Sequence, residues 1–480
     1  MASLSATIKS IQNIMRQDAG VDGDAQRISQ LVWLLFLKIF DTKEEDEEAL
    51  KEYDSPIPEE LRWRNWAANP EGLTGTDLLD FVNDELFPQL KNLQPTSATD
   101  RAHLVRDIFE DSYNYMKSGT LLRKVVNELE KGIDYGSRHD RHLFNDIYEQ
   151  ILRDLQSAGN AGEFYTPRAV TQLVTELVNP TYEGGRQTMD PACGTAGFLI
   201  NALEYMRQQT PLTTDERRAQ WQNSVRGYEK KPLPHLLATT NLLLHDVETP
   251  GAVVHTNTLK AWRDLPEVDY LLSNPPFGGL EESVVASGFP ADYRTTETAD
   301  LFLYLMIEKL KLGGRAGVVL PDGSLFGESG VKLRVKERLL QQCNLHTIVR
   351  LPNGVFAPYT GIRTNLLFFD RTGTPTKEVW YYEHPYPAGV KNYSKTRPIR
   401  IEEFGELKKW WHSRYENEHA WRVSVEDIKA RGYNLDIKNP NTQLKEEETS
   451  STEVLQSLSA SLVRSGELVE KLKQLIAHEG

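Results

Sequence analysis

Between residues 186 and 370 the sequence alternates short apolar runs with longer segments of helical periodicity. Such runs indicate buried β-strands, and helices between them are typical of a mostly parallel sheet. The connection between the last two runs is too short for a crossover helix, so one antiparallel strand is expected at the end. The sequence therefore predicts an α/β fold with a Rossmann-like, seven-stranded sheet. The expected strands are 188–190, 225–229, 252–255, 268–274, 316–321, 346–352 and 364–370, and three of the helices are 196–208, 233–245 and 300–312.

The flanks of this region differ from it and from each other. Residues 1–155 carry apolar side chains at three- and four-residue spacing, which predicts an all-α N-terminal domain. Its helices are expected at 27–40, 77–90, 100–117 and 144–155, and its acidic run Asp41–Glu48 is expected to be a solvated helix end or loop. The sheet domain is expected over 156–375, followed by a mixed extension, 376–440, and a polar linker, 441–452. Residues 453–480 have the spacing of a heptad-like helix, which could pack on its own chain or on a partner.

Composition excludes several classes of protein. Hydrophobic residues make up 39% and charged residues 26%, the mixture of a soluble globular chain. No apolar run reaches the roughly 20 residues of a membrane span, and no secretory signal is visible. The two cysteines, Cys193 and Cys343, cannot form a disulfide framework, so a cytoplasmic location is expected. No cluster has metal-ligand spacing and no P-loop occurs, so neither a metal nor ATP hydrolysis is expected of this chain.

Charge is distributed unevenly along the chain. The net charge is −14, and residues 1–155 hold 18 Lys and Arg against 29 Asp and Glu, which leaves the remainder nearly neutral at 37 against 40. DNA affinity comes largely from cations that neutralise phosphates. If this protein handles DNA, a partner should supply much of the affinity.

A glycine-rich segment joins the first expected strand to a helix and reads Asp190-Pro-Ala-Cys-Gly-Thr-Ala-Gly-Phe198. Gly194 and Gly197 let the backbone approach a ligand closely, and the helix N-terminus presents unpaired N–H groups to a carboxylate or phosphate. A G-x-G-x-x-G pattern is missing, which counts against a dinucleotide. Glu229, after the second strand, is placed to bind ribose hydroxyls. Cys193 reads as a small loop residue rather than a nucleophile, because no histidine partner lies near it in the sequence.

The tetrapeptide Asn274-Pro275-Pro276-Phe277 ends the fourth expected strand. An exocyclic amine on an aromatic base is a poor nucleophile because its lone pair is delocalised into the ring. Two acceptors for its N–H groups would favour tetrahedral geometry, and the Asn274 side-chain oxygen and the Pro275 carbonyl can supply them. Phe277 offers a face on which the base can stack. Standing alone, the tetrapeptide could be a simple turn, but its position after the two preceding motifs favours catalysis.

These three motifs, with Glu163-Phe-Tyr-Thr-Pro-Arg168 before them, resemble those of the gamma-order N6-adenine DNA methyltransferases. The acidic helical N-terminal domain and the 163–168 segment make the chain similar to the modification (HsdM) subunits of type I restriction–modification systems. This resemblance implies methyl transfer from S-adenosylmethionine to adenine N6 in double-stranded DNA. It also implies that the target base is flipped out of the duplex.

The resemblance also implies roles for individual residues. Phe356 is expected to help to hold the extruded base, or else to be a core aromatic before the last strand. Asn257 occupies a position where the family commonly places an acidic residue towards the cofactor adenine, and its amide oxygen could still accept from the adenine amine. The cofactor-binding set is then Glu163, Tyr165, Thr166, Asp190, Gly194, Thr195, Gly197, Glu229 and Asn257, and the base-binding catalytic set is Asn274, Pro275, Pro276 and Phe277.

Partners follow from the same resemblance. Only about 110 residues follow Asp370, too few for a recognition domain, so a separate specificity subunit that binds two copies of this chain is implied, with a restriction subunit in the full complex. Two rival functions remain open at this stage. One is a methyltransferase that acts on a protein glutamine amide or on RNA, and the other is a catalytically silent scaffold of a DNA-binding complex.

Overall fold

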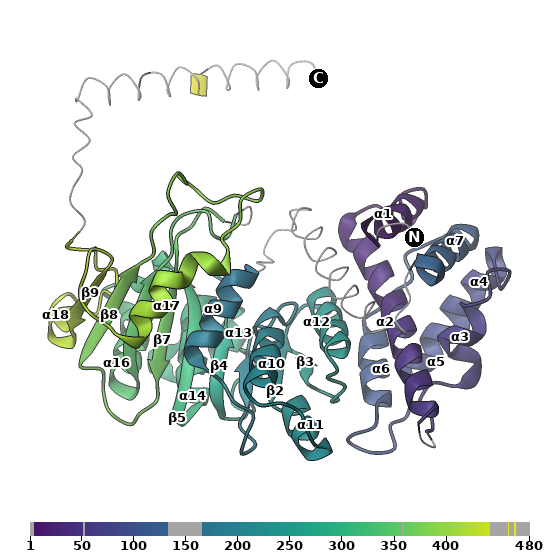
Figure 1. Ribbon diagram of the computed structural model, residues 1–480, viewed down its shortest axis with the longest axis horizontal. Coiled ribbons are helices and arrows are strands. Elements are labelled where there is room, and N and C mark those ends of the chain that lie inside the picture. The colour runs from purple at the N-terminus through teal and green to yellow at the C-terminus, as the bar shows by residue number, and fades with distance from the viewer. Residues whose placement is uncertain are drawn as a thin grey trace. The chain divides into compact units, whose positions relative to one another are not determined.

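The computed structural model in Figure 1 describes residues 4–50, 53–132, 166–357 and 360–441, together with 459 and 465–466. Contacts group Met1–Lys438 into one unit and Asn439–Gly480 into another. The expected helix at 144–155, and 453–480 apart from those three residues, lie outside the described residues. None of the described helices is long and apolar enough to cross a membrane.

The N-terminal part is helical, as the periodicity predicted. The 25-residue helix α2 is its centre, because Trp33, Phe36 and the apolar residues around them are fully buried. The expected helix at 100–117 is shorter in the structure and ends at Glu110. The elements here are α1 (Leu4–Met15), α2 (Asp24–Glu48), η1 (Glu59–Leu61), α3 (Trp63–Trp66), α4 (Gly75–Asp80), the π-helical turn η2 (Phe81–Leu86), α5 (Phe87–Lys91), α6 (Ala102–Glu110) and α7 (Gly119–Gly132).

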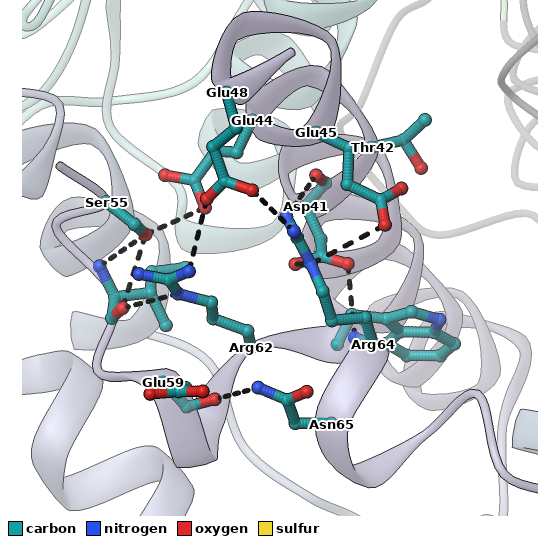
Figure 2. A network of polar contacts seen from close by, with 12 residues as sticks. Asp41, Thr42, Glu44, Glu45, Glu48, Ser55, Glu59, Arg62, Arg64 and Asn65 are labelled. Atoms are coloured by element: carbon teal, nitrogen blue, oxygen red, sulfur yellow. Dashed lines mark hydrogen bonds and ion pairs between the residues drawn. The ribbon is translucent and has the colours of Figure 1, made fainter. Parts of the chain in front are cut away.

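The acidic run at the end of α2 is only partly solvated, and the expectation is wrong for Asp41 and Glu44, which are buried. Figure 2 shows Arg62 and Arg64 directed at this face of the helix. The Arg64 Nε lies 2.9 Å from an Asp41 carboxylate oxygen, and both arginines contact Glu48. Residues 41, 44 and 48 share one face of a helix, so the charged partners that follow in the chain can bury that face.

The second part of the chain forms one nine-stranded sheet in the order β3-β2-β1-β4-β5-β7-β6-β8-β9. Neighbouring strands are parallel except where β7 pairs with β5 and β6 and where β9 pairs with β8. The strands are β1 (Thr188–Asp190), β2 (Val225–Glu229), β3 (Val253–His255), β4 (Val268–Ser273), β5 (Leu310–Pro321), β6 (Asn344–Arg350), β7 (Thr364–Asp370), β8 (Glu378–Glu383) and β9 (Ala420–Ser424).

The predicted α/β fold and the single antiparallel strand among the first seven are confirmed, but the strand count is not. The sheet continues through β8 and β9, so part of the mixed extension belongs to it. The strand β5 also begins at Leu310, which ends the preceding helix at Lys309 rather than at 312.

Helices cover both faces of the sheet (Figure 1). Successive residues of a strand enter opposite cores: Leu272 packs with α9, α10 and α17, whereas Leu271 packs with α14 and α16. The helices of this part are α9 (Arg168–Val178), α10 (Gly197–Gln209), α11 (Asp215–Gln222), α12 (Pro232–Leu244), α13 (Ser283–Ala286), η3 (Ala291–Tyr293), α14 (Thr298–Lys309), α15 (Asp322–Leu325), α16 (Gly330–Gln342), η4 (Ile401–Phe404), α17 (Gly405–His412) and α18 (Val425–Ala430).

Helix α12 contributes to two cores. Its residues Ala238 and Leu242 face the sheet, whereas Leu237 and Leu244 join the core of the N-terminal helices. This double burial explains why the helix is apolar on almost every side. An ion pair also connects α2 with the residues just after α12, since the Lys43 ammonium lies 2.8 Å from the Asp246 carboxylate.

Candidate active site

The glycine-rich loop lies where β1 ends and α10 begins, at the carboxyl edge of the parallel strands. Gly194 has a φ of +54°, and a Cβ added there would meet nothing within 4 Å, so open space lies beside the backbone. Cys193 is buried, and its sulfur would lie 2.8 Å from a Cβ added at Gly227. Burial raises the pKa of the Cys193 thiol, which agrees with its interpretation as a packed loop residue.

Asp190 is the last residue of β1 and is 1% exposed. One of its carboxylate oxygens accepts a hydrogen bond from the Ser273 hydroxyl at 2.7 Å and another from the Ala192 N–H at 3.1 Å. Burial raises the pKa of Asp190 to about 7, and the charge of Glu229 acts in the same direction. Both hydrogen bonds lower this pKa, but they do not compensate for burial.

Glu229 ends β2 and contacts the glycine-rich loop directly. Its carboxylate accepts a hydrogen bond from the Gly194 N–H at 3.0 Å and one from the Lys231 N–H at 2.8 Å. Two backbone donors therefore fix the carboxylate beside the open space at Gly194. The expected ribose ligand and the expected cradle for the amino-acid part lie next to each other.

Asn274 follows β4, and only the NH2 group of its side-chain amide has a hydrogen-bond partner among the described residues. The Nδ2 group donates to the Thr166 hydroxyl at 2.8 Å, whereas the Oδ1 atom is buried without a hydrogen-bond partner in the part of the chain that the structure describes. A buried acceptor without a donor is unfavourable by roughly 1–3 kcal/mol. Pro275 beside it is buried and Pro276 is exposed, so the acceptor sits on a stiff, partly covered segment.

Phe277 is partly buried, and its ring meets that of Phe356 edge to face, with centroids 5.6 Å apart and an interplanar angle of 70°. Phe356 itself is 1% exposed and belongs to the core under α9 and α17. It therefore has the burial expected of a core aromatic, and it supports Phe277 from behind.

Asn257 lies two residues beyond β3. Its Oδ1 atom accepts from the Leu259 N–H at 3.1 Å, and its Nδ2 group donates to the Glu281 carboxylate at 3.3 Å. Sequence reasoning missed Glu281, which is buried in the loop after the tetrapeptide. The sequence carries no signal that distinguishes it from Glu282, which is exposed.

The structure describes some of the remaining expected site residues but not all of them. Thr166 contacts Asn274, Gly197 begins α10, and the Thr195 carbonyl accepts from the Asn241 amide at 2.9 Å. Glu163 and Tyr165 lie outside the described residues. Among the residues that are described, no group of three or more His, Cys, Asp or Glu side chains could hold a metal ion.

Two family models match the chain. Residues 139–449 match the N-6 DNA methylase family, and residues 4–129 match the HsdM N-terminal domain. The methylase subunit of the type I restriction enzyme EcoEI from Escherichia coli is 58% identical over 451 residues, which cover 91% of this chain and 90% of that subunit.

Solved structures agree with these matches. A crystal structure from Vibrio vulnificus YJ016, of a chain assigned as the modification subunit of a type I restriction enzyme, aligns with a TM-score of 0.83 and 42% identity over 92% of this chain and 97% of that one. A chain from a structure that describes complex assembly and conformational transition of the type I restriction–modification system aligns with a TM-score of 0.79 and 38% identity, over 100% of this chain and 99% of that one.

The sheet, the motif positions and the family match define an adenine-specific DNA methyltransferase of the N-6 DNA methylase class. With the helical N-terminal domain added, the chain belongs to the methylase (HsdM) subunits of type I restriction–modification systems.

Proposed function

We propose that this chain transfers the methyl group of S-adenosylmethionine to N6 of an adenine flipped out of double-stranded DNA, and that Asn274 Oδ1 and the Pro275 carbonyl accept the two amine hydrogens. The observation that carries the proposal is the buried Oδ1 atom of Asn274, which has no hydrogen-bond partner among the described residues. A target amine would satisfy it at the moment of reaction. The interaction would thus favour the attacking geometry of the base.

The residues around the glycine-rich loop suit the cofactor, which the N-6 DNA methylase family uses. Gly194 borders open space, and we assign the buried carboxylate of Asp190 to a cationic amino-acid group. Glu229, fixed by two backbone donors, can accept from ribose hydroxyls. When bound, S-adenosylmethionine supplies the methyl group as an electrophile on a sulfonium. The chain's task is to hold the amine in line with it.

Phe277 is assigned to the flipped base. Its ring is supported by Phe356, so it can offer a fixed surface for stacking. Neither Asn274 nor Pro275 is a base, so the proton that the methylated amine loses passes to water. The rival substrates, a glutamine amide or RNA, are not supported by the family match.

The assembly is part of the same proposal. A specificity subunit would read the DNA sequence and hold two copies of this chain, and a restriction subunit would join the full complex. The charge of the chain supports this division of labour, because residues 1–155 are acidic and the rest is nearly neutral.

Two substitutions test the assigned roles. Glu229→Ala should weaken S-adenosylmethionine binding by ~1.5–3 kcal/mol, as expected for a hydrogen bond to a charged group. Asn274→Ala should leave that binding nearly intact and abolish methyl transfer. Calorimetry and a labelled-methyl assay on DNA measure the two effects, with Glu229→Gln as the control that keeps one acceptor oxygen. Equal loss of cofactor binding in both alanine variants would show that the roles are wrongly assigned.

A further inference from the structure

The loop after the catalytic tetrapeptide buries one carboxylate and exposes its neighbours. Glu281 is 8% exposed, whereas Leu280 and Val284 are 73% and 74% exposed and Glu282 is also exposed. Two side chains from elsewhere in the chain contact Glu281. The Lys230 ammonium lies 3.2 and 3.4 Å from the two carboxylate oxygens, and the Asn257 amide donates to one of them at 3.3 Å. Burying a carboxylate is unfavourable without such partners, so they determine where this loop lies.

The partners of Glu281 come from strands that are not adjacent to its own. Glu281 follows β4, Lys230 follows β2 and Asn257 follows β3, while β1 lies between β4 and β2 in the sheet. The loop must therefore extend past the carboxyl end of β1 to make these contacts. That end carries Asp190 and the glycine-rich loop, which form the proposed cofactor cradle.

The loop is also fixed on its other side. The Glu281 N–H donates to the Thr296 carbonyl at 2.8 Å, and Leu280 pairs with Glu297 in an isolated bridge. The Thr298 hydroxyl donates to the Gly278 carbonyl at 3.2 Å. The loop that starts at Asn274 is thus held at two places: by Thr296–Thr298 at the head of α14 and, through Glu281, by the loops after β2 and β3.

Lys230 and Asn257 both adjoin the assigned adenosine end of the site. Lys230 follows the ribose ligand Glu229 directly, and Asn257 is the residue expected to face the cofactor adenine. The orientation of the Asn257 amide is set from both ends, since its oxygen accepts from Leu259 and its NH2 group donates to Glu281. Glu281 is therefore in contact with two neighbours of the adenosine position and is covalently connected to Asn274 by the six residues 275–280.

From this arrangement we infer that Glu281 is a positioning residue that links the adenosine end of the cofactor site to the loop carrying Asn274. The inference rests on the proposed function. The ion pair between Glu281 and Lys230 holds the loop over the proposed cofactor cradle. The position of the cofactor and the positions of the two amine acceptors, Asn274 Oδ1 and the Pro275 carbonyl, are therefore coupled. The ion pair is partly exposed and therefore weak by itself, so a bound cofactor should add to the stability of the closed loop.

Calorimetry with the full-length chain tests the link, with S-adenosylmethionine and 5′-methylthioadenosine as the two ligands. The second ligand has the adenosine part but no amino-acid group. We expect Glu281→Gln to raise the dissociation constants of both ligands by a similar factor, about tenfold. Glu282→Gln, a carboxylate-to-amide change at the exposed neighbour, is the matched control and should leave both constants unchanged.

Lys230 provides a second variant that does not threaten the fold, since its side chain is 57% exposed. Lys230→Met should also raise the dissociation constants of both ligands. The double variant with Glu281→Gln should lose no more affinity than Glu281→Gln alone. In the assembled methylase, Glu281→Gln should lower kcat as well as raise the KM for the cofactor, because the acceptor loop is displaced. Thermal melting of each variant separates these effects from unfolding.

Hydrogen exchange gives the decisive readout. In the parent chain, cofactor addition should slow exchange of the amides of residues 278–282, and Glu281→Gln should abolish that protection. Parental affinities and parental protection in Glu281→Gln would overturn the inference while leaving the proposed function intact. Failure of the parent chain to bind the cofactor would instead refute the proposed function, and the inference would fail with it.

Discussion

Single residues at this site combine structural and functional requirements that conflict in the isolated chain. Asp190 is buried deeply enough for its pKa to rise to about 7, yet the role proposed for it requires a charge that pairs with a cationic ligand group. Asn274 likewise keeps a buried acceptor without a partner among the described residues. Both conditions are unfavourable for folding, and on the proposed function both would be relieved when ligand and substrate bind, as is typical of functional sites.

The raised pKa of Asp190 makes cofactor binding dependent on pH. Below about pH 7 the free chain holds a proton on Asp190 that must leave before the carboxylate can pair with a cation. The affinity for S-adenosylmethionine should therefore rise by up to about tenfold per pH unit below the pKa, level off above it, and fall again once the ligand's own α-amino group loses its proton near pH ~8. Calorimetry between pH 5.5 and 8.5 measures this dependence. Asp190→Asn should bind weakly with little dependence on pH, and a slope as steep as the parent's would assign the proton to another group.

Phe277 should act on the flipped base through stacking, worth ~1–3 kcal/mol per base by analogy with single-strand binders. Phe277→Trp should retain part of the activity, whereas Phe277→Ala should retain little. The assembled methylase, with 2-aminopurine at the target position, reports the extruded base by its fluorescence. Unchanged methyl transfer by Phe277→Ala would remove this residue from the site.

At the scale of elements, sequence periodicity predicted the strands whose two faces are both buried. The strand β7 lies at 364–370, as expected, because both of its faces are covered and its residues form a continuous apolar run. The strand β9 is short, and its burial falls towards its end, so it has no comparable pattern. The positions of Asp190, Glu229 and Asn274 followed from strand ends, which are local. Glu281 did not, because its burial depends on residues that come from two other strands.

The buried face of α2 also depended on tertiary contacts. Nothing within 41–48 reveals that Arg62 and Arg64 return to this face, so a solvated helix end was the natural expectation. Figure 2 shows how two arginines convert part of an acidic run into an internal network. The solvent exposure of a charged run on a helix therefore cannot be predicted until the residues that pair with it are known.

One carboxyl of this network should control the pH dependence of stability. Burial raises the pKa of Glu44 to about 7 despite hydrogen bonds from Ser55 and Tyr53. A folded carboxyl with a raised pKa stabilises the fold most at low pH, and this contribution is lost as the pH rises from about 4.5 through 7. Glutamine imitates the protonated acid, so Glu44→Gln should increase the free energy of unfolding at pH 8 by on the order of 2 kcal/mol and little at pH 5.

Thermal unfolding of the two proteins at pH 5 and pH 8 measures this difference. The exposed Glu60 provides the control, since Glu60→Gln should change the melting temperature little at either pH. A Glu44→Gln variant that is less stable than the parent at pH 8 would indicate that the ionised carboxylate, rather than the acid, is the favoured form.

At the scale of the whole molecule, the charge of the chain favours a catalytic subunit that depends on partners for its target. The described residues include most of the candidate site at the sheet edge, yet the chain has a net charge of −14. Specific DNA binding commonly needs several phosphate contacts from Lys and Arg in addition to base contacts. Catalysis and recognition are therefore expected on different chains.

The isolated chain should bind DNA weakly and without sequence preference, and its C-terminal segment should matter for assembly. The segment 453–480 has heptad-like spacing but also contains Gly466, so a helix there would need an apolar surface to pack on. Deleting residues 453–480 should impair co-elution with the specificity subunit far more than it impairs cofactor binding measured by calorimetry. A mobility-shift titration checks the first expectation, and tight, sequence-selective binding by the chain alone would refute it. Quantitative co-elution of the truncated chain would assign the segment to packing within its own chain.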